Sequence, residues 1–296
     1  LHSRAVIRLS VDDGTSTELD ALRERHLGKI ENFMLRSTTN IAYGFIDEVP
    51  TVQALRWNDM KLIVTGLFKQ LKMPVEGWAE FWRRIARELD VRLNSRVSGV
   101  DRSADRPVVT LDTGETEAFD LIVCAVPLDE FNKMTEPTPM ERAAAAAVEW
   151  NGYTTTLFAA ENWFNDVHVE AFREAVVPGA QRGQMLSARR DGYEAELGGD
   201  LYLAGQLTGD FTGPELEELL RADVAKHGGR VTNLILQKRW KYFAQYSPDA
   251  VRDGLLTDLR TMQGEKSTWY TGAIFSHEAV SHIVNFNAGL VRKMHR

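Results

Sequence analysis

The feature that most constrains the fold is a hairpin pattern followed directly by a run of apolar residues. Residues 108–111 and 117–119 flank Asp-Thr-Gly-Glu, which predicts a β-hairpin with a glycine in its turn. Residues 121–126 are then continuously apolar and end at Pro127, as expected of a strand buried on both faces of a sheet. Since helical patterns surround this segment, the chain is predicted to be α/β, with mixed α+β character.

Further elements are predicted on both sides of this segment. Residues 78–89 place apolar side chains at i, i+3, i+4 and i+7, which predicts an amphipathic helix with its aromatic residues in the core. Pro214 near a first helical position and Gly228-Gly229 at the end predict a helix over 214–227. Other expected helices are 51–71, 141–150 and 278–294, and other expected strands are 153–160, 200–206, 234–242 and 267–273.

Charge and cysteine content exclude several classes of protein. A net charge of −7 argues against a nucleic-acid partner, which would require a basic face. The single cysteine, Cys124, allows no internal disulfide and is expected to be a small buried residue. No apolar run approaches the roughly 20 residues of a membrane span, and no signal peptide is visible, so a cytoplasmic protein is expected. Because the chain begins at Leu1 rather than methionine, we expect its true start to lie upstream.

Three familiar motifs are approached but not matched. Gly205, Gly209 and Gly213 are four residues apart, whereas a dinucleotide loop requires G-x-G-x-x-G. His277 and His282 are five apart, so on a helix they would point about 140° apart and could not share a metal. No G-x-S-x-G elbow is present. We therefore predict no metal site and no serine hydrolase.

An ordered set of short anchors resembles the flavin amine oxidase superfamily, and within it the bacterial polyenoic fatty acid isomerases. The resemblance extends over residues 40–294. Its anchors are short and come in the expected order: Tyr43-Gly44-Phe45, Val49-Pro50, Gly77-Trp78, Val97, Ala125-Val126-Pro127-Leu128, Trp240-Lys241-Tyr242-Phe243, Gly254, Met262-Gln263-Gly264 and residues 269–272.

This resemblance implies an FAD-binding Rossmann-like domain interleaved with an amine-oxidase-type substrate domain. The FAD-binding segments would be 75–130 and 265–296, and the substrate domain 1–74 and 131–264. The G-x-G-x-x-G loop and ribose-binding acid that open such a domain are absent from the 296 residues. The FAD-binding domain is thus expected to be incomplete. We expect the chain alone to bind FAD weakly or not at all, with another chain or segment supplying the G-x-G-x-x-G unit.

The resemblance also implies which residues meet the cofactor. Val97 would lie against the adenine through its backbone, and Gly272 and Ala273 would pass the ribityl-phosphate region. Ala279 and Val280 would begin the terminal helix beside the flavin pyrimidine ring. Free N–H groups and the positive end of a helix favour negative charge on that ring in its reduced state.

The substrate is expected to be an apolar or amphipathic small molecule, since no aromatic cage for an amine is evident. The catalytic residues are unknown; Lys61, Lys69 and His277 are candidates for a general base by position only, and none is assigned. The expected pocket walls are aromatic: Tyr43, Phe45, Trp57, Phe68, Trp240 and Tyr242.

The favoured function is the C-terminal portion of an FAD-dependent oxidoreductase or hydride-transfer isomerase. One alternative is a non-catalytic relic that kept the fold and lost its cofactor. Another is a split flavoenzyme whose first βαβ unit comes from a separate chain. A last alternative is a plain α/β binding protein for an acyl ligand, which would need only the substrate domain.

Overall fold

The computed structural model describes residues 16–24, 31–57, 64 and 74–295. The chain forms two compact units: unit 1 comprises residues 1–57 and 147–255, and unit 2 comprises residues 58–146 and 256–296. Both units combine helices and strands, which confirms the α/β prediction. The predicted division into FAD-binding and substrate segments stays a prediction. No described helix has the length and apolar character needed to cross a bilayer.

Unit 1 is built around a five-stranded antiparallel sheet in the order β10-β6-β9-β8-β7. Strands β6, β9 and β10 were predicted, whereas the long strand β8 and the short edge strand β7 were not. The bounds are β6 (Tyr153–Glu161), β7 (Val169–Ala171), β8 (Met185–Glu194), β9 (Gly199–Leu207) and β10 (Arg230–Trp240).

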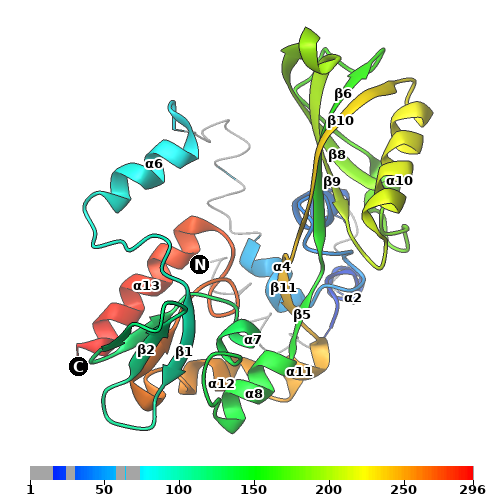
Figure 1. The fold of residues 1–296 in the computed structure, drawn as a ribbon. Helices are drawn as coiled ribbons and strands as arrows, with labels where there is room; N and C mark the ends of the chain where they lie inside the picture. The colour runs from blue at the N-terminus through cyan, green and yellow to red at the C-terminus, as the bar shows by residue number, and fades with distance from the viewer. Residues whose placement is uncertain (1–15, 25–30, 58–63, 65–73, 296) are drawn as a thin grey trace. The chain divides into compact units, whose positions relative to one another are not determined.

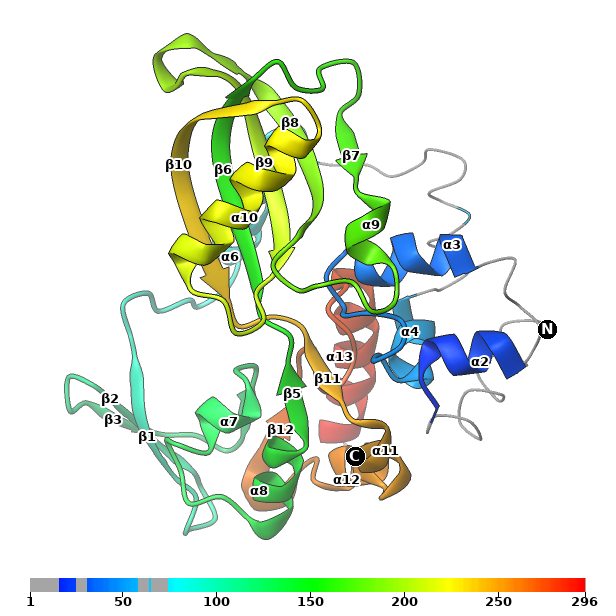
Figure 2. The same cartoon turned by 90° about the vertical axis from the view of Figure 1, so that its right-hand side faces the viewer.

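Helix α10 (Gly213–Lys226) lies along one face of this sheet (Figures 1 and 2). Thr212 and Glu215 form a capping box at its start, and Gly228 follows its end with φ of +84°. Leu216, Leu220 and Val224 are fully buried on its inner side. One part of the core of unit 1 therefore lies between α10 and the sheet, and the core also includes buried residues of segment 19–54.

The remaining elements of unit 1 are short. Residues 148–150 form strand β5, paired with β11, so the predicted helix over 141–150 is wrong at its C-terminal end; a β-branched and an aromatic residue favour the extended pairing. Residues 40–50 form turns and loop, with Ala42 at φ of +72°. The elements are α2 (Glu18–Glu24), α3 (Glu31–Met34), the π-helix η2 (Leu35–Thr39), α4 (Thr51–Trp57), β5 (Val148–Trp150), α9 (Arg173–Val176), η3 (Ala195–Leu197), β11 (Ala244–Tyr246) and α11 (Pro248–Arg252).

Unit 2 contains a three-stranded antiparallel sheet and a two-stranded parallel one. The predicted hairpin is confirmed, with Gly114 at φ of +86° in its turn. The parallel sheet pairs β4 (Ile122–Cys124) with β12 (Thr268–Tyr270). The other elements are β1 (Val97–Asp101), β2 (Val108–Leu111), β3 (Thr116–Ala118), α6 (Gly77–Ala86), α7 (Leu128–Phe131), α8 (Pro139–Ala146), α12 (Leu255–Thr261), η4 (Glu265–Ser267) and α13 (Val280–Met294).

Two predictions about burial in unit 2 are wrong. The segment around β4 was expected to be buried on both faces, but Val123 is 45% exposed and Val126 46%. The aromatic residues of α6 were expected in the core, but none of its residues is buried, and Trp78 and Trp82 are each 46% exposed. The physical reason is that, within the described part of unit 2, the sheet of β4 has only one partner strand and the apolar face of α6 has no covering layer.

Candidate functional site

All five residues predicted to meet the cofactor lie in unit 2. Val97 begins β1 and pairs with Leu111. Gly272 and Ala273 follow β12, and Gly272 has φ of +104°, a conformation that favours glycine. A Cβ at Gly272 would lie 3.9 Å from the carbonyl of Ala125, so the ends of the two parallel strands are adjacent. Their roles toward a cofactor stay predictions.

The parallel pair has one closed edge and one open edge. On β12, the Gln263 side chain accepts from the Tyr270 amide at 2.9 Å and donates to the Tyr270 carbonyl at 3.1 Å, as a neighbouring strand would. On the other side, the Thr271 amide donates to the Cys124 carbonyl at 2.9 Å. Because backbone groups alternate along a strand, those of Val123 point away from β12, and they have no partner among the described residues. The open edge is therefore that of β4.

The N-terminus of α13 is open as well. Its N-cap residue, Ala279, makes no side-chain cap, and its amide donates to Nδ1 of His277 at 3.0 Å. The next two amides, of Val280 and Ser281, have no partner within the described ranges. Two unpaired N–H groups at the positive end of a 15-residue helix suit an electron-rich group. This end of the helix thus fits the ring edge that the resemblance assigns to it.

His277 lies just before this helix, and the geometry that excluded a metal there was wrong. The rings of His277 and His282 have centroids 4.9 Å apart, because His277 precedes the helical segment and the helical angle between them does not apply. In the described residues, no group of three or more His, Cys, Asp or Glu could hold a metal. Nδ1 of His277 accepts a hydrogen bond, so a neutral ring carries its proton on Nε2. The other candidate bases, Lys61 and Lys69, lie outside the described residues.

The expected substrate walls that the structure describes lie in unit 1, where Tyr43 and Tyr242 both contact Phe243. Tyr43 stacks on Phe243 with centroids 4.4 Å apart, Phe243 lies 3.9 Å from Tyr242, and Tyr242 lies 6.2 Å from Tyr153. We call these four residues the aromatic cluster. Tyr43 is 1% exposed, whereas Tyr242 is 40% exposed, so the cluster connects the core to the surface. Phe243 and Tyr153 were not predicted as wall residues, although Phe243 ends the anchor that begins at Trp240 and Tyr153 begins a predicted strand.

The other predicted wall residues are dispersed. Phe45 is 3% exposed in the hydrophobic core. Trp240 is 43% exposed, and its indole N–H donates to Oγ1 of Thr155 at 2.9 Å. Trp57 ends α4, where the structure describes no side chain, and Phe68 lies outside the described residues. The six residues therefore do not form one described pocket.

Tyr153 has an unusual environment. Burial, and to a lesser extent the neighbouring Tyr242, raise the pKa of Tyr153 to about 12. The phenol therefore stays protonated at neutral pH, so it can donate a hydrogen bond but cannot serve as a base. It lies over the backbone of Gly205, where a Cβ would be only 1.7 Å from the hydroxyl oxygen.

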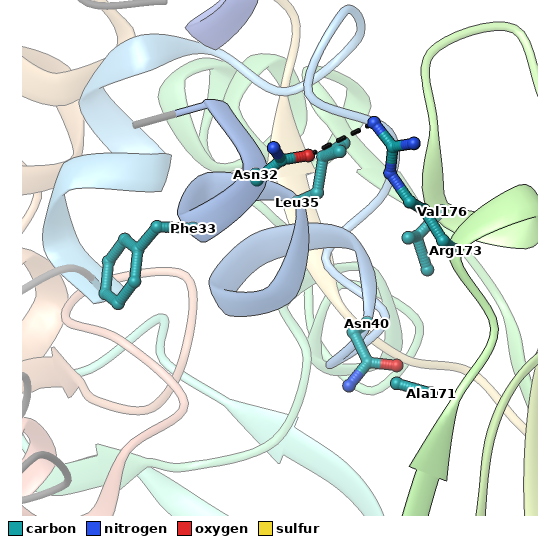
Figure 3. Close-up of a pocket in the computed structure, with 7 residues that line it drawn as sticks. All are labelled: Asn32, Phe33, Leu35, Asn40, Ala171, Arg173 and Val176. Carbon is teal, nitrogen blue, oxygen red and sulfur yellow. Dashed lines mark hydrogen bonds between the residues drawn. The ribbon is translucent and has the colours of Figure 1, made fainter. Parts of the chain in front are cut away.

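A mostly apolar cavity of about 450 Å³ lies in unit 1 among α3, η2, β7 and α9. Arg173 and Asn32 meet at one end, where the guanidinium donates to the Asn32 amide oxygen at 3.3 Å (Figure 3). Asn40 lies beside Ala171, and its Oδ1 is buried with no partner in the described part of the chain. The other walls are apolar: Phe33, Leu35 and Val176. An apolar cavity with a cation at one end suits an amphipathic anion.

Comparisons with known proteins identify a family and a fold. The sequence model of the family described as flavin containing amine oxidoreductase matches residues 10–272. The crystal structure of the CLA-producing fatty acid isomerase from P. acnes is similar with a TM-score of 0.85, at 18% identity, over 95% of this chain and 67% of that one. Wild-type putrescine oxidase bound to putrescine is similar with a TM-score of 0.64, at 12% identity, over 96% of this chain and 69% of that one. These similarities show a shared fold. No curated protein matches the chain.

Proposed function

Because this chain belongs to the flavin containing amine oxidoreductase family, we propose that it is part of an FAD-dependent oxidoreductase or hydride-transfer isomerase for an apolar or amphipathic small molecule. The family implies a flavin, and FAD in particular is our proposal. The fold similarity to both an isomerase and an oxidase is compatible with either reaction.

The open N-terminus of α13 is the observation that carries this proposal. Bound FAD would supply hydride transfer at its N5 atom. The amides of Val280 and Ser281 would hold the electron-rich edge of the ring, and the helix dipole would favour negative charge there. Gly272 carries no side chain, so its backbone allows close approach of a ligand. Val97 and Ala273 would complete the cofactor contacts.

We propose that the substrate is an amphipathic carboxylate. The cavity with Arg173 at one end and apolar walls along the rest supports this class. The aromatic cluster supplies a second apolar surface in the same unit. The similar P. acnes protein is a fatty acid isomerase, which also supports an acyl substrate over a small amine.

We also propose that a βαβ unit carrying G-x-G-x-x-G docks on the open edge of β4. Val123 presents an unpaired backbone edge, and exposed apolar side chains surround it, with Leu121 at 40% and Val126 at 46% exposure. A sheet of two parallel strands is smaller than is usual, and parallel sheets are normally covered on both faces. The same edge also favours the second candidate, a non-catalytic relic or split subunit that does not bind FAD by itself.

A reconstitution experiment distinguishes these functions. We would titrate FAD into the 296-residue chain, alone and with a polypeptide carrying the βαβ unit, and follow the absorbance and fluorescence of bound flavin. If flavin binds only to the mixture of the two polypeptides, the flavoenzyme is supported. If flavin binds neither to the chain alone nor to the mixture, the relic is supported. Gly272→Val should reduce the bound flavin, whereas Gly289→Ala, in open space on α13, should not. The coding sequence upstream of Leu1 would show whether the same gene encodes the unit.

The substrate class is tested by anaerobic reduction of the reconstituted flavin. We expect an unsaturated fatty acid to bleach the flavin, or to be isomerised, and putrescine to do neither. Arg173→Gln should raise KM for the fatty acid about tenfold with little change in kcat, since the guanidinium would bind the carboxylate remote from the reacting carbon. Bleaching by putrescine alone would contradict an acyl substrate.

A further inference from the structure

A second cavity of unit 1, of about 730 Å³, is polar and belongs to neither surface described above. Its walls come from β5, β11 and the loops that carry Arg182 and Asp210. Asn151 and Gln245, two of its amide side chains, are 9% and 8% exposed. Its charged side chains are Arg182, Glu149, Asp210 and Glu215, of which Glu215 is already used in the capping box of α10.

Two polar atoms of this cavity are buried without a hydrogen-bond partner among the described residues. They are Nη1 of Arg182 and Oε1 of Gln245. Each side chain is held by its other end: Nη2 of Arg182 donates to Glu48, and Nε2 of Gln245 donates to Oδ1 of Asn151 at 3.0 Å. A buried polar group with no partner is destabilising and is rare in native proteins. One donor and one acceptor without partners thus belong to two side chains that line the same cavity.

The chemistry of these groups selects a ligand. A guanidinium N–H pairs best with a carboxylate, and an amide oxygen requires an N–H or O–H donor. Glu149 and Asp210 line the same cavity as exposed carboxylates, and they favour a positive charge. We infer that the cavity binds a small zwitterion with a carboxylate and an ammonium group, of the class of the free amino acids. A simple anion would leave Oε1 of Gln245 without a donor, and a simple amine would leave Nη1 of Arg182 without an acceptor.

This cavity is connected to the segment that carries Tyr43 and Phe45. Nδ2 of Asn151 donates to the Tyr43 carbonyl, and the Arg182 guanidinium lies 5.4 Å from the centroid of the Phe45 ring. A ligand paired with Arg182 and Gln245 would therefore contact side chains that hold this segment in place. The inference does not depend on a flavin, because every residue in it lies in unit 1.

Binding to the flavin-free, 296-residue chain tests the inference. We would screen the free L-amino acids by thermal shift and measure the strongest by calorimetry. We expect at least one to bind with a Kd of about 1 mM or tighter. Its analogue without the ammonium group and its analogue without the carboxylate should each bind about tenfold more weakly, since each loses a charge-assisted contact. No binding by any amino acid, or equal binding of the simple carboxylate, would overturn the inference.

Matched variants locate the site. Arg182→Gln should abolish binding, whereas Arg189→Gln, whose guanidinium pairs with Asp191 away from the cavity, should not change it. Because Arg182 also supports the fold through Glu48, the exposed Asp210→Asn provides a variant that should fold normally. Asp210→Asn should weaken binding of the amino acid several-fold and leave binding of the simple carboxylate unchanged. Asp166→Asn, outside the cavity, should affect neither affinity. Binding that neither Arg182→Gln nor Asp210→Asn changes would overturn the assignment.

Discussion

The guanidinium of Arg102 and the carboxylate of Glu141 form two hydrogen bonds, of 2.6 and 2.8 Å, inside unit 2. Both side chains are 1% exposed. The Tyr270 hydroxyl also contacts Glu141 and lies 3.1 Å from Nη1 of Arg102. Arg102 follows β1, Glu141 belongs to α8 and Tyr270 ends β12, so this group joins three segments that are distant in sequence.

Removing one partner of this pair should be strongly destabilising. Glu141→Gln leaves the Arg102 charge buried without its counter-ion, and we expect the free energy of unfolding to fall by about 3–5 kcal/mol. Urea denaturation followed by circular dichroism measures the change. The matched control is Glu136→Gln, which removes the exposed partner of Arg142 and should cost less than about 1 kcal/mol. Equal losses for the two variants would contradict a special role for the buried pair.

The same pair predicts how stability depends on pH. Burial acts to raise the pKa of Glu141, but the hydrogen bonds from Arg102 and Tyr270 outweigh it and lower the pKa below its ordinary value. A carboxyl whose pKa is lowered in the folded state contributes stability above its unfolded pKa of about 4.3 and loses it as the pH falls further. The stability difference between wild type and Glu141→Gln should therefore be constant near neutral pH and shrink below about pH 4. A difference that grows on acidification would contradict this sign.

Gln263 should be needed for the parallel sheet of unit 2. Its amide makes both hydrogen bonds that a neighbouring strand would make to Tyr270, so Gln263→Ala leaves an N–H and a C=O of β12 unpaired. We expect a loss of about 2 kcal/mol in the free energy of unfolding, and faster hydrogen exchange at Tyr270. Gln263→Glu keeps the acceptor and loses the donor, so its effect should be smaller. Unchanged exchange at Tyr270 in the alanine variant would show that Gln263 does not protect this edge.

Strands could be predicted from the sequence where residues close together in the chain form a clear apolar or turn pattern. Strands β6 and β9 and the hairpin were predicted, because β-branched runs and turn residues mark them. Strand β8 was missed because Arg189, Arg190 and Asp191 interrupt its apolar pattern. In the structure these charges are neutralised in pairs, Arg189 with Asp191 and Arg190 with Asp200, which the linear sequence does not indicate.

For the candidate site, resemblance placed individual residues, but their surroundings could not be predicted. The end of β12 and the start of α13 follow from sequence anchors and helical pattern. The pairing of Gln263 with Tyr270, seven residues later, depends on the turn between them, which has no recognised sequence pattern. The shared cavity of Arg182 and Gln245 arises only when distant segments pack together. The exposure of Val123 also contradicted its apolar pattern, because burial depends on neighbouring strands and not on the strand itself.

Gly205 should tolerate no side chain while Tyr153 is present. A Cβ at this position would lie 1.7 Å from the Tyr153 hydroxyl oxygen and 2.5 Å from its ring carbon, so Gly205→Ala must displace the ring. We expect a loss of about 1–3 kcal/mol in stability, typical of overpacking. In the double variant with Tyr153→Ala, the loss of stability should be smaller than the sum of the losses in the two single variants. Strict additivity in this cycle would show that the two residues do not interact.

Cys124 should report the opening of the parallel sheet. Burial raises the pKa of its thiol to about 11, and the side chain is 5% exposed, so little thiolate exists at pH 8 and reagent cannot reach it. We expect native protein to react with a thiol reagent about 100-fold more slowly than urea-unfolded protein, and to react completely, with one thiol per chain, once unfolded. Since Cys124 is the only cysteine, the signal is unambiguous. Gln263→Ala should speed the reaction, because it weakens the strand that pairs with β4, whereas Glu136→Gln should not. Rapid labelling of the native wild type would show that β4 and β12 separate readily without the βαβ unit.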